Sequence, residues 1–486
     1  MKKPAAFLMI VVLLCTVCAC GSKSGADNGN VVTGQNPGIQ QDADREPTVT
    51  GPGFSVQDTD KSNNAEGGGM RSFLNSYGEA ACNTESGFYY LTKKTVKLRD
   101  GSDGRHLMYM DFATEREIYL CSTASCKHDS LDCPAVFLKD DFPVSSSRLF
   151  VFGDKLYILA RGYYYDNSAT QTVITSNYDN SLVTESRPDV LYRANLDGTE
   201  RKKVYTFDAD ITLEDMVIGN DQGIYLITKK LSIEKYEGQV FINSMDQKLV
   251  FLNLNSLSME EICPMTFEGH ISWDIIGCSQ NEFILKGIDH GREVSQEEIW
   301  DDDAYYELYQ NSFTVYARLS KDGGKPEEIC RQSNFYYNSG KVLGDSLYLS
   351  SAENQKIEAV TIKTGEKRTL CTLPQNRIMD VLGDMLCCQD WNLTGDCTWY
   401  FVNTKTGAVT KTPLVNRYNG QSIEFRGQTA SDVLFVYDYD VEKYNDNPYG
   451  IDQHEINQKK HALISKEDLF AGREDYRKIE MVGPGQ

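Results

Sequence analysis

The stretch LYRANLDGTERKKVYTF, from Leu191 to Phe207, decides the fold class of this 486-residue chain. Apolar and polar residues alternate on both sides of Asp197-Gly198. Alternation with a period of two is typical of a half-buried strand. Asp-Gly between two such runs indicates a hairpin, because glycine adopts a positive φ without steric cost. The stretch therefore predicts two antiparallel strands joined by a tight turn.

Weaker copies of this hairpin recur from about residue 79 onward, together with three landmarks. A tyrosine or phenylalanine lies within the second strand of most copies. A Gly-Asp or Asn-Asp turn precedes that second strand, at residues 153–154, 220–221, 344–345 and 383–384. A glycine turn joins the third strand to the fourth, at residues 197–198, 322–323, 364–365 and 406–407.

Four-strand units at this spacing predict an all-β fold, a β-propeller with seven four-stranded blades. The units cover residues 79–121, 147–206, 213–264, 272–330, 337–371, 378–413 and 423–481. Six or eight blades are alternatives, because insertions blur the third and fourth units. A long array of β-sandwiches is the structural competitor, and the regular turn between third and fourth strands argues against it.

The N-terminus has the pattern of a processing signal. Lys2 and Lys3 precede an apolar run from Ala5 to Val17, which is too short to span a membrane comfortably. The following residues, VCACGS, resemble a bacterial lipobox in which Cys20 is the lipidated residue and the mature N-terminus. The alternative is an ordinary secretory signal that is cleaved nearby.

We therefore expect a signal peptide at 1–19, a lipid-anchored disordered linker at 20–70 and a propeller domain at 71–486. The linker is rich in Gly, Ser, Asp, Asn, Pro and Gln and cannot bury enough apolar surface to fold. As a flexible coil it would span roughly 40 Å. The predicted location is the outer face of the cell membrane, anchored by palmitate at Cys20.

The net charge of −21 excludes one class of partner. Loss of Lys2 and Lys3 with the signal peptide would make the mature chain more negative still. Such a charge repels nucleic-acid phosphates, so no nucleic acid is expected as a partner. The expected partners are the membrane, through the lipid, and a glycan or protein ligand; we expect a monomer.

The hairpin at 191–207 resembles the repeated unit of low-density-lipoprotein-receptor-type propellers and of the Tol-type periplasmic propeller. Three features together resemble a group of uncharacterised β-propeller lipoproteins of Gram-positive bacteria. They are the lipobox at Cys20, LCSTASCKHDSLDC at Leu120–Cys133 and LISKEDL at Leu463–Leu469. The resemblance implies a propeller at the cell surface, with no assigned activity for most such proteins.

Cys121, Cys126, His128 and Cys133 fall within thirteen residues, and Cys121 closes a predicted strand. Thiolates and imidazole are zinc ligands, although C-x₄-C-x-H-x₄-C is not a standard zinc pattern. Three interpretations stay open: a Cys126–Cys133 disulfide that braces a loop, a structural metal site, or free thiols. No other cofactor is expected.

Aromatic and acidic groups interrupt the predicted strands. Glu293–Tyr309 and the acidic residues of 438–446 are each interpreted as solvated helical insertions rather than calcium sites. Exposed aromatics can stack on sugars or anchor a protein partner. The candidate ligand contacts are Tyr163, Tyr164, Tyr165, Tyr305, Tyr306, Tyr336 and Tyr337.

These features favour a surface-anchored propeller that binds or scaffolds an extracellular glycan, peptide or protein. The sequence contains neither G-x-S-x-G nor H-E-x-x-H, and no catalytic residue is assigned. Two alternatives stay open. One is an envelope assembly or sensor protein, and the other is a polysaccharide-active enzyme with converging carboxylates in the propeller funnel.

Overall fold

A computed structural model places most of the chain from residue 69 to residue 482. The described residues are 69–73, 80–142, 147–160, 163–165, 173–175, 183–186, 188–208, 211–213, 217–236, 239–265, 272–295, 298, 302–335, 338–351, 353–373, 376–390, 398–444 and 453–482. The predictions for Cys20, the signal peptide, most of the linker and the pair Tyr336–Tyr337 lie outside these residues. Among the helices that are described, none has the length and apolar character needed to cross a membrane.

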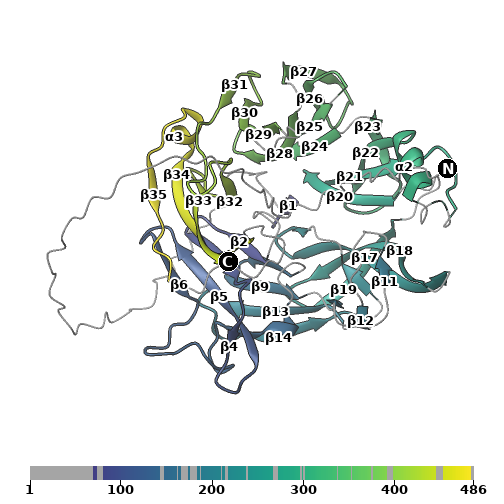
Figure 1. Cartoon of the computed structure of the whole chain (residues 1–486). Coiled ribbons are helices and arrows are strands. Elements are labelled where there is room, and N and C mark those ends of the chain that lie inside the picture. Colours follow the sequence, from purple (N-terminus) through teal and green to yellow (C-terminus); the bar gives the residue numbers. More distant parts are fainter. Residues whose placement is uncertain are drawn as a thin grey trace, which may run out of the picture.

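Seven sheets, each with four antiparallel principal strands, lie around a ring and form a β-propeller (Figure 1). Each blade has four principal strands in sequence order from the centre outward, so the predicted fold class and blade number are confirmed. Apolar clusters fill the space between neighbouring blades. In one of them, Phe150 and Leu159 of the second blade pack with Leu226 and Leu252 of the third.

The first four blades occupy the chain from residue 81 to residue 333. Blade one has β2 (Ala81–Asn83), β3 (Gly87–Leu91), β5 (Asp103–Asp111) and β6 (Arg116–Tyr119), with short β4 (Val96–Lys97) and β7 (Val136–Leu138) also paired to β5. Blade two has β8 (Arg148–Phe152), β9 (Lys155–Ala160), β13 (Val190–Asn195) and β14 (Lys202–Thr206). Blade three has β16 (Ile218–Gly219), β17 (Gly223–Tyr236), β18 (Gln239–Asn253) and β19 (Ser258–Pro264). Blade four has β20 (Ser272–Ser279), β21 (Glu282–Asp289), β22 (Phe313–Ser320) and β23 (Glu327–Ser333).

The last three blades complete the ring. Blade five has β24 (Asn338–Leu343), β25 (Ser346–Ser351), β26 (Lys356–Thr361) and β27 (Lys367–Thr372). Blade six has β28 (Asn376–Leu382), β29 (Met385–Asp390), β30 (Thr398–Asn403) and β31 (Val409–Lys411). Blade seven has β32 (Glu424–Gln428), β33 (Asp432–Tyr444), β34 (Gln453–Ser465) and β35 (Tyr476–Lys478). The remaining elements are β1 (Arg71–Ser72), β10 (Tyr163–Tyr165), β11 (Val173–Thr175), β12 (Val183–Ser186), β15 (Ile211–Leu213), the 3₁₀ helix η2 (Lys139–Asp141), α2 (Asp302–Gln310) and α3 (Lys466–Phe470).

Two expectations about elements need correction. The acidic residues 438–442 lie in β33, which pairs with β34 as far as Tyr444, instead of forming a helical insertion. Cross-strand charge pairs such as Lys460 with Asp438, 3.1 Å apart, support that extended hairpin. Blade three begins at Ile218 rather than at Leu213, whose strand β15 pairs beside β16 on β17. The expected helix after Glu293 is present as α2.

The repeated glycine turn serves the contact between blades as well as the hairpin itself. Gly198, Gly365 and Gly407 all have positive φ. A Cβ atom added to them would lie 2.6, 3.0 and 2.3 Å, respectively, from a carbonyl oxygen at the outer edge of the preceding blade. A side chain at these turns would therefore push neighbouring blades apart.

The two faces of the ring are unequal. Because the strands of a blade alternate in direction, first-to-second and third-to-fourth turns emerge on one face, which we call the turn face. Most of these turns are short, whereas the third-to-fourth connection of blade seven, residues 466–475, contains α3. Second-to-third connections emerge on the other face, which we call the insertion face, and they include residues 161–189, residues 290–312 and the extended ends of the β17–β18 and β33–β34 hairpins. Among the connections between strands of one blade, most of the added chain length therefore lies on the insertion face.

The N-terminal strand β1 lies near the centre of the ring and adds to the innermost strand of blade three (Figure 1). Phe73 packs against Phe150 and Phe152, and its amide donates to Val217 O. In the opposite direction along the chain, Arg71 pairs with Asp221 at 2.9 Å and the Met70 amide donates to Gln280 O. Asp221 and Gln280 belong to first-to-second turns, so the chain enters the described structure from the turn face.

Blade one and blade seven close the ring without sharing a strand. The segment after β35 bridges to the outer strand of blade one, where the Glu117 amide donates to Glu480 O and the Glu480 amide donates to Glu115 O. Ile479 packs in a cluster that joins Phe88 of blade one to Leu434 of blade seven. Side-chain packing and a short backbone bridge therefore hold this seam.

Candidate functional site

The loop between β6 and β7 brings together the Cys-His cluster, which consists of Cys121, Cys126, His128 and Cys133. Their ligand atoms all lie within 4.8 Å of one another. His128 Nδ1 is 3.2 Å from Cys133 Sγ, and the three cysteines are free thiols in this structure. Strand β6 ends at Tyr119, so Cys121 belongs to this cluster and not to the strand.

Backbone and ring contacts hold the loop in place. Both of its ends are hydrogen-bonded to Leu107 of β5, whose amide donates to Ala135 O and whose carbonyl accepts from the Leu120 amide. His106 Nε2 lies 2.8 Å from the His128 carbonyl. The Tyr119 ring stacks on the His128 ring at 4.2 Å. These contacts orient His128 with Nδ1 toward the sulfurs.

Burial governs the protonation of the cluster. Cys133 is buried beside Leu98 and Val136, and burial raises the pKa of its thiol. Burial also lowers the pKa of His128 and that of His106, so both imidazoles are neutral at pH 7. A neutral imidazole and three sulfurs make up the donor set of a tetrahedral metal site.

A second feature lies on the insertion face of blade four. We call Tyr306, Tyr309, Phe313 and Phe335 the aromatic patch. All four are exposed, Phe335 most of all at 60%. They lie at one end of the blade, on α2, at the start of β22 and directly after β23. Exposed aromatics that gather at one end of a blade are typical of interaction surfaces.

Alternation explains why two of these rings point outward. Ser312, Thr314 and Asn334 are buried and hydrogen-bonded to one another, with Thr314 Oγ1 2.6 Å from Asn334 Oδ1 and Asn334 Nδ2 2.7 Å from Ser312 Oγ. Phe313 and Phe335 follow Ser312 and Asn334 in the chain and therefore face solvent. The buried polar groups fix the base of the patch.

The tyrosines predicted as ligand contacts differ in exposure and position. Tyr306 is 40% exposed, whereas Tyr305 is half-buried with its ring centroid 6.4 Å from that of His290. Tyr163, Tyr164 and Tyr165 form β10 in the second-to-third connection of blade two, and Tyr336 and Tyr337 lie outside the described residues. Sequence reasoning missed Phe313 and Phe335. The sequence pattern that could have indicated them is a phenylalanine beside polar residues, once where β22 begins and once just after β23 ends.

Blade seven carries a charged cluster on its inner strands. Lys459 Nζ lies 2.9 Å from both Glu424 oxygens, and Arg426 Nη1 lies 2.9 Å from Oε1. Although burial raises the pKa of Glu424, the two cations outweigh it and bring the pKa to about 2. Glu424 is therefore ionised and bound to two cations, which makes it unsuitable as a general acid. Sequence gave no signal for a cluster whose members lie up to 35 positions apart.

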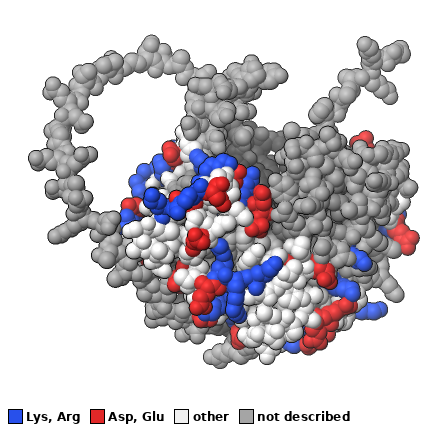
Figure 2. Space-filling model, turned by 90° about the horizontal axis from the view of Figure 1, so that it is seen from below, with Lys and Arg blue, Asp and Glu red and all other residues white. Residues whose placement is uncertain are grey.

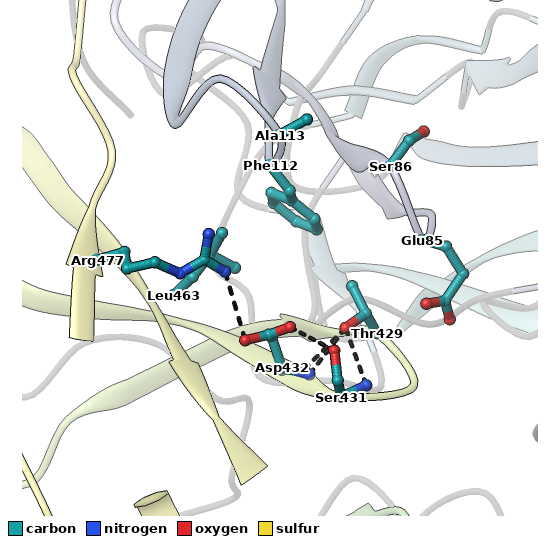
Figure 3. Close-up of a pocket in the computed structure, with 9 residues that line it drawn as sticks. All are labelled: Glu85, Ser86, Phe112, Ala113, Thr429, Ser431, Asp432, Leu463 and Arg477. Atoms are coloured by element: carbon teal, nitrogen blue, oxygen red, sulfur yellow. Dashed lines mark hydrogen bonds and ion pairs between the residues drawn. The ribbon is translucent and has the colours of Figure 1, made fainter. Parts of the chain in front are cut away.

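A pocket of about 260 Å³ lies on the turn face, at the seam between blade one and blade seven (Figure 3). Its polar groups are satisfied within the protein. Arg477 reaches Glu115 and Asp432, and the Ala430 amide donates to Glu85. The pocket is smaller than a typical ligand site, and its groups contribute to ring closure.

Charged side chains of both signs are mixed on the described surface that one view shows. Figure 2 shows one side of the molecule, on which acidic and basic side chains of the described residues lie next to one another. Exposed ion pairs such as Lys97–Asp103 and Lys248–Glu261 also bring opposite charges together at the surface. On the described surface in that view, no continuous basic field would suit a polyanion.

Comparison with known proteins finds distant structural neighbours, several of which contain β-propellers. No family model and no curated protein matches the chain. A puromycin-hydrolyzing peptidase of Mycobacterium tuberculosis is 11% identical, with a TM-score of 0.45 over 86% of this chain and 55% of that one. The β-propeller domain of the Trilobed protease from Pyrococcus furiosus is 10% identical, with a TM-score of 0.41 over 85% and 100%. TolB from Acinetobacter baumannii is 11% identical, with a TM-score of 0.32 over 79% and 78%.

Puromycin hydrolases are longer proteins, and this chain spans about half of their length. Tol-type and other propellers are among the structural neighbours of the chain. The likeness to lipoproteins of Gram-positive bacteria stays a prediction.

Proposed function

We propose that this chain is a lipid-anchored propeller of the cell surface that binds an extracellular glycan, peptide or protein through its insertion face. The observation that carries the proposal is the inequality of the two faces. The insertion face bears the longest connections and the aromatic patch, whereas the turn face has mostly short turns, apart from the connection of blade seven that contains α3. Binding residues gather on loops that a rigid scaffold positions, and here they gather on one side.

The path of the N-terminal strand supports this assignment. The chain reaches β1 from the turn face, next to Asp221 and Gln280. A lipid on Cys20 would therefore place the tether on the turn face and leave the insertion face free of it. Anchor and binding surface lie on opposite sides of the ring in this arrangement, so ligand approach is unobstructed.

The aromatic patch is the proposed contact surface. Beside it, the Arg331 guanidinium lies 5.6 Å from the Phe313 ring centroid and is held by Asp289 and Glu328. Fixed aromatic rings next to an oriented charge can stack on a sugar or anchor a peptide side chain. Truncation of exposed rings should weaken binding without disturbing the buried Ser312–Thr314–Asn334 base.

Two measurements test the proposal. The full chain is screened on glycan arrays and in pull-downs from extracellular fractions, as wild type, as Phe335→Ala with Tyr306→Ala, and as Val409→Ala. Val409 is an exposed apolar residue at the third-to-fourth turn of blade six, on the opposite face. We expect at least a tenfold loss of affinity in the patch variant and none in the Val409 control, because a few central aromatics dominate most interfaces.

Equal binding by both variants would exclude the patch. Turnover of a polysaccharide that the patch variant retains would favour the enzyme alternative. The anchor is tested separately by palmitate labelling, which Cys20→Ala should abolish; unchanged labelling would exclude lipidation at Cys20.

A further inference from the structure

We propose that Cys121, Cys126, His128 and Cys133 bind one Zn²⁺ in a closed, structural Cys₃His site. Zinc in such sites is tetrahedral, with Zn–S near 2.3 Å and Zn–N near 2.0–2.1 Å, which separates neighbouring ligand atoms by about 3.5–3.8 Å. All four ligand atoms already lie within 4.8 Å of one another, and the His128–Cys133 pair is 3.2 Å apart. Small side-chain rotations therefore suffice to complete the tetrahedron.

The composition of the loop indicates that it needs a cross-link. Between Cys121 and Cys133 the one large apolar residue is Leu131, and its side chain is 44% exposed. The loop therefore lacks a hydrophobic anchor of its own, and the cysteines are the residues that pack inward against Leu98 and Val136. Burial of so little apolar surface does not offset the conformational entropy that the loop loses when it becomes ordered, so another source of free energy is needed.

The residues of the loop with unfavourable backbone conformations also lie in or next to the cluster. Ser125 and His128 have positive φ values of 60° and 54°, a conformation that is uncommon and unfavourable for residues other than glycine. Ser125 immediately precedes Cys126, and His128 is itself a member of the cluster. These two conformations turn Cys126 and His128 toward Cys121 and Cys133.

The arrangement fits zinc better than the other two interpretations. A Cys126–Cys133 disulfide would use two of the four converging groups and leave the Cys121 thiol and the His128 imidazole beside it. Free thiols would explain the burial of Cys133 but not the imidazole nitrogen that faces its sulfur. A metal uses all four donors. The contacts of His128 with His106 and Tyr119 then act as the outer layer that orients a ligand.

The site would be structural because the protein fills all four positions and leaves none for substrate. Zinc would join the end of β6 to the start of β7 at the outer edge of blade one. That edge contacts blade two, where Arg201 Nη1 donates to Pro134 O at 2.9 Å and its guanidinium lies 3.8 Å over the Phe137 ring. Loss of the metal should therefore loosen blade one against blade two.

The test begins with the wild-type full chain, purified without chelators. Zinc content is measured by elemental mass spectrometry, and the metal is then exchanged for Co²⁺. We expect one zinc per chain and, with cobalt, the visible bands of a tetrahedral thiolate complex. Zinc removal should lower the thermal midpoint of unfolding, and restored zinc should raise it again.

Variants locate the ligands. Cys126→Ser and His128→Asn should lose the zinc and the cobalt spectrum, whereas Cys371→Ser, in blade five, should keep both. A wild-type chain that stays metal-free after incubation with Zn²⁺, or whose intact mass shows a Cys126–Cys133 disulfide, would overturn the proposal. Both readouts use the wild type, so they hold even if a variant fails to fold. They are also independent of ligand binding by the insertion face.

Discussion

At Gly407 a single hydrogen atom, in place of a methyl group, allows two blades to meet. The residue has a φ of 72°, and a Cβ there would lie 2.3 Å from Leu370 O of blade five. Gly344 has a similar φ of 61°, but a Cβ there would meet nothing within 4 Å. Both positions favour glycine because of their positive φ, but only Gly407 also needs glycine because of the contact with the neighbouring blade.

Alanine substitution at these two positions should give different losses of stability. Gly344→Ala should lower the free energy of unfolding by about 1–2 kcal/mol, through backbone strain alone. Gly407→Ala should lose about 1–3 kcal/mol more, because the methyl group also overpacks the contact with blade five. Urea unfolding of both variants measures the difference. Equal losses would show that the contact between blades does not require glycine.

The sequence predicted the glycine turns as parts of hairpins, but it did not predict that they also contact the preceding blade. Asp197-Gly198 indicates a hairpin from local residues alone, whereas the carbonyl of Leu120 that excludes a side chain at Gly198 lies far away in the chain. Likewise, the sequence predicted the Cys-His cluster, because its members Cys121, Cys126, His128 and Cys133 are close together in the chain. The Glu424–Lys459 pair gave no such signal, because only the fold brings its members together.

Among the elements, local periodicity predicted the blade strands well and the insertions less well. The strands of blades five and six follow from alternation and turn residues. The end of the β33–β34 hairpin does not, because DYDVEKY is acidic and resembles a solvated segment until its pairing with β34 is known. Strand β1 was also missed, since two residues carry no periodicity.

Strand β1 should contribute to stability despite its length. Phe73, directly after it, is buried against Phe150 and Phe152. Phe73→Ala should lower the free energy of unfolding by about 3–5 kcal/mol and release the N-terminal strand from blade three. Thermal unfolding measures the first effect and limited proteolysis near residue 70 the second. Protease resistance equal to that of the wild type would show that β1 is held by other contacts.

The whole ring depends on a seam between its first and last blades. Arg426 of blade seven lies 5.8 Å from the Phe88 ring centroid of blade one, and His461 is fully buried close to Arg426, Glu424 and Lys459. Burial, aided by the nearby Arg426 charge, lowers the pKa of His461 to about 3. The seam therefore contains a neutral imidazole beside a charged network.

Acid should weaken the ring in two stages. Below pH 6.5 the unfolded chain protonates His461 while the folded chain does not, so stability falls by up to about 1.4 kcal/mol per pH unit from this residue. Below pH 4.5 Glu424 adds a loss in the same direction, because its pKa in the folded chain is about 2.

Urea midpoints measured between pH 7 and pH 4.5 test the first stage of this loss. His461→Leu should flatten the profile in that window, although His106, His128 and His290 have lowered pKa values and keep part of the slope. An unchanged slope would show that His461 does not titrate on unfolding.

The central position of β1 has a mechanical consequence for a chain anchored at its N-terminus. A pull on the leading segment is delivered near the axis of the disc and not at its rim, so it exerts little torque. The disc would be tethered close to its centre, and the predicted flexible linker would leave it free to spin about that axis. Rotation about the tether would bring each blade to every side of the anchor point in turn. The aromatic patch of blade four could then meet a ligand on any side.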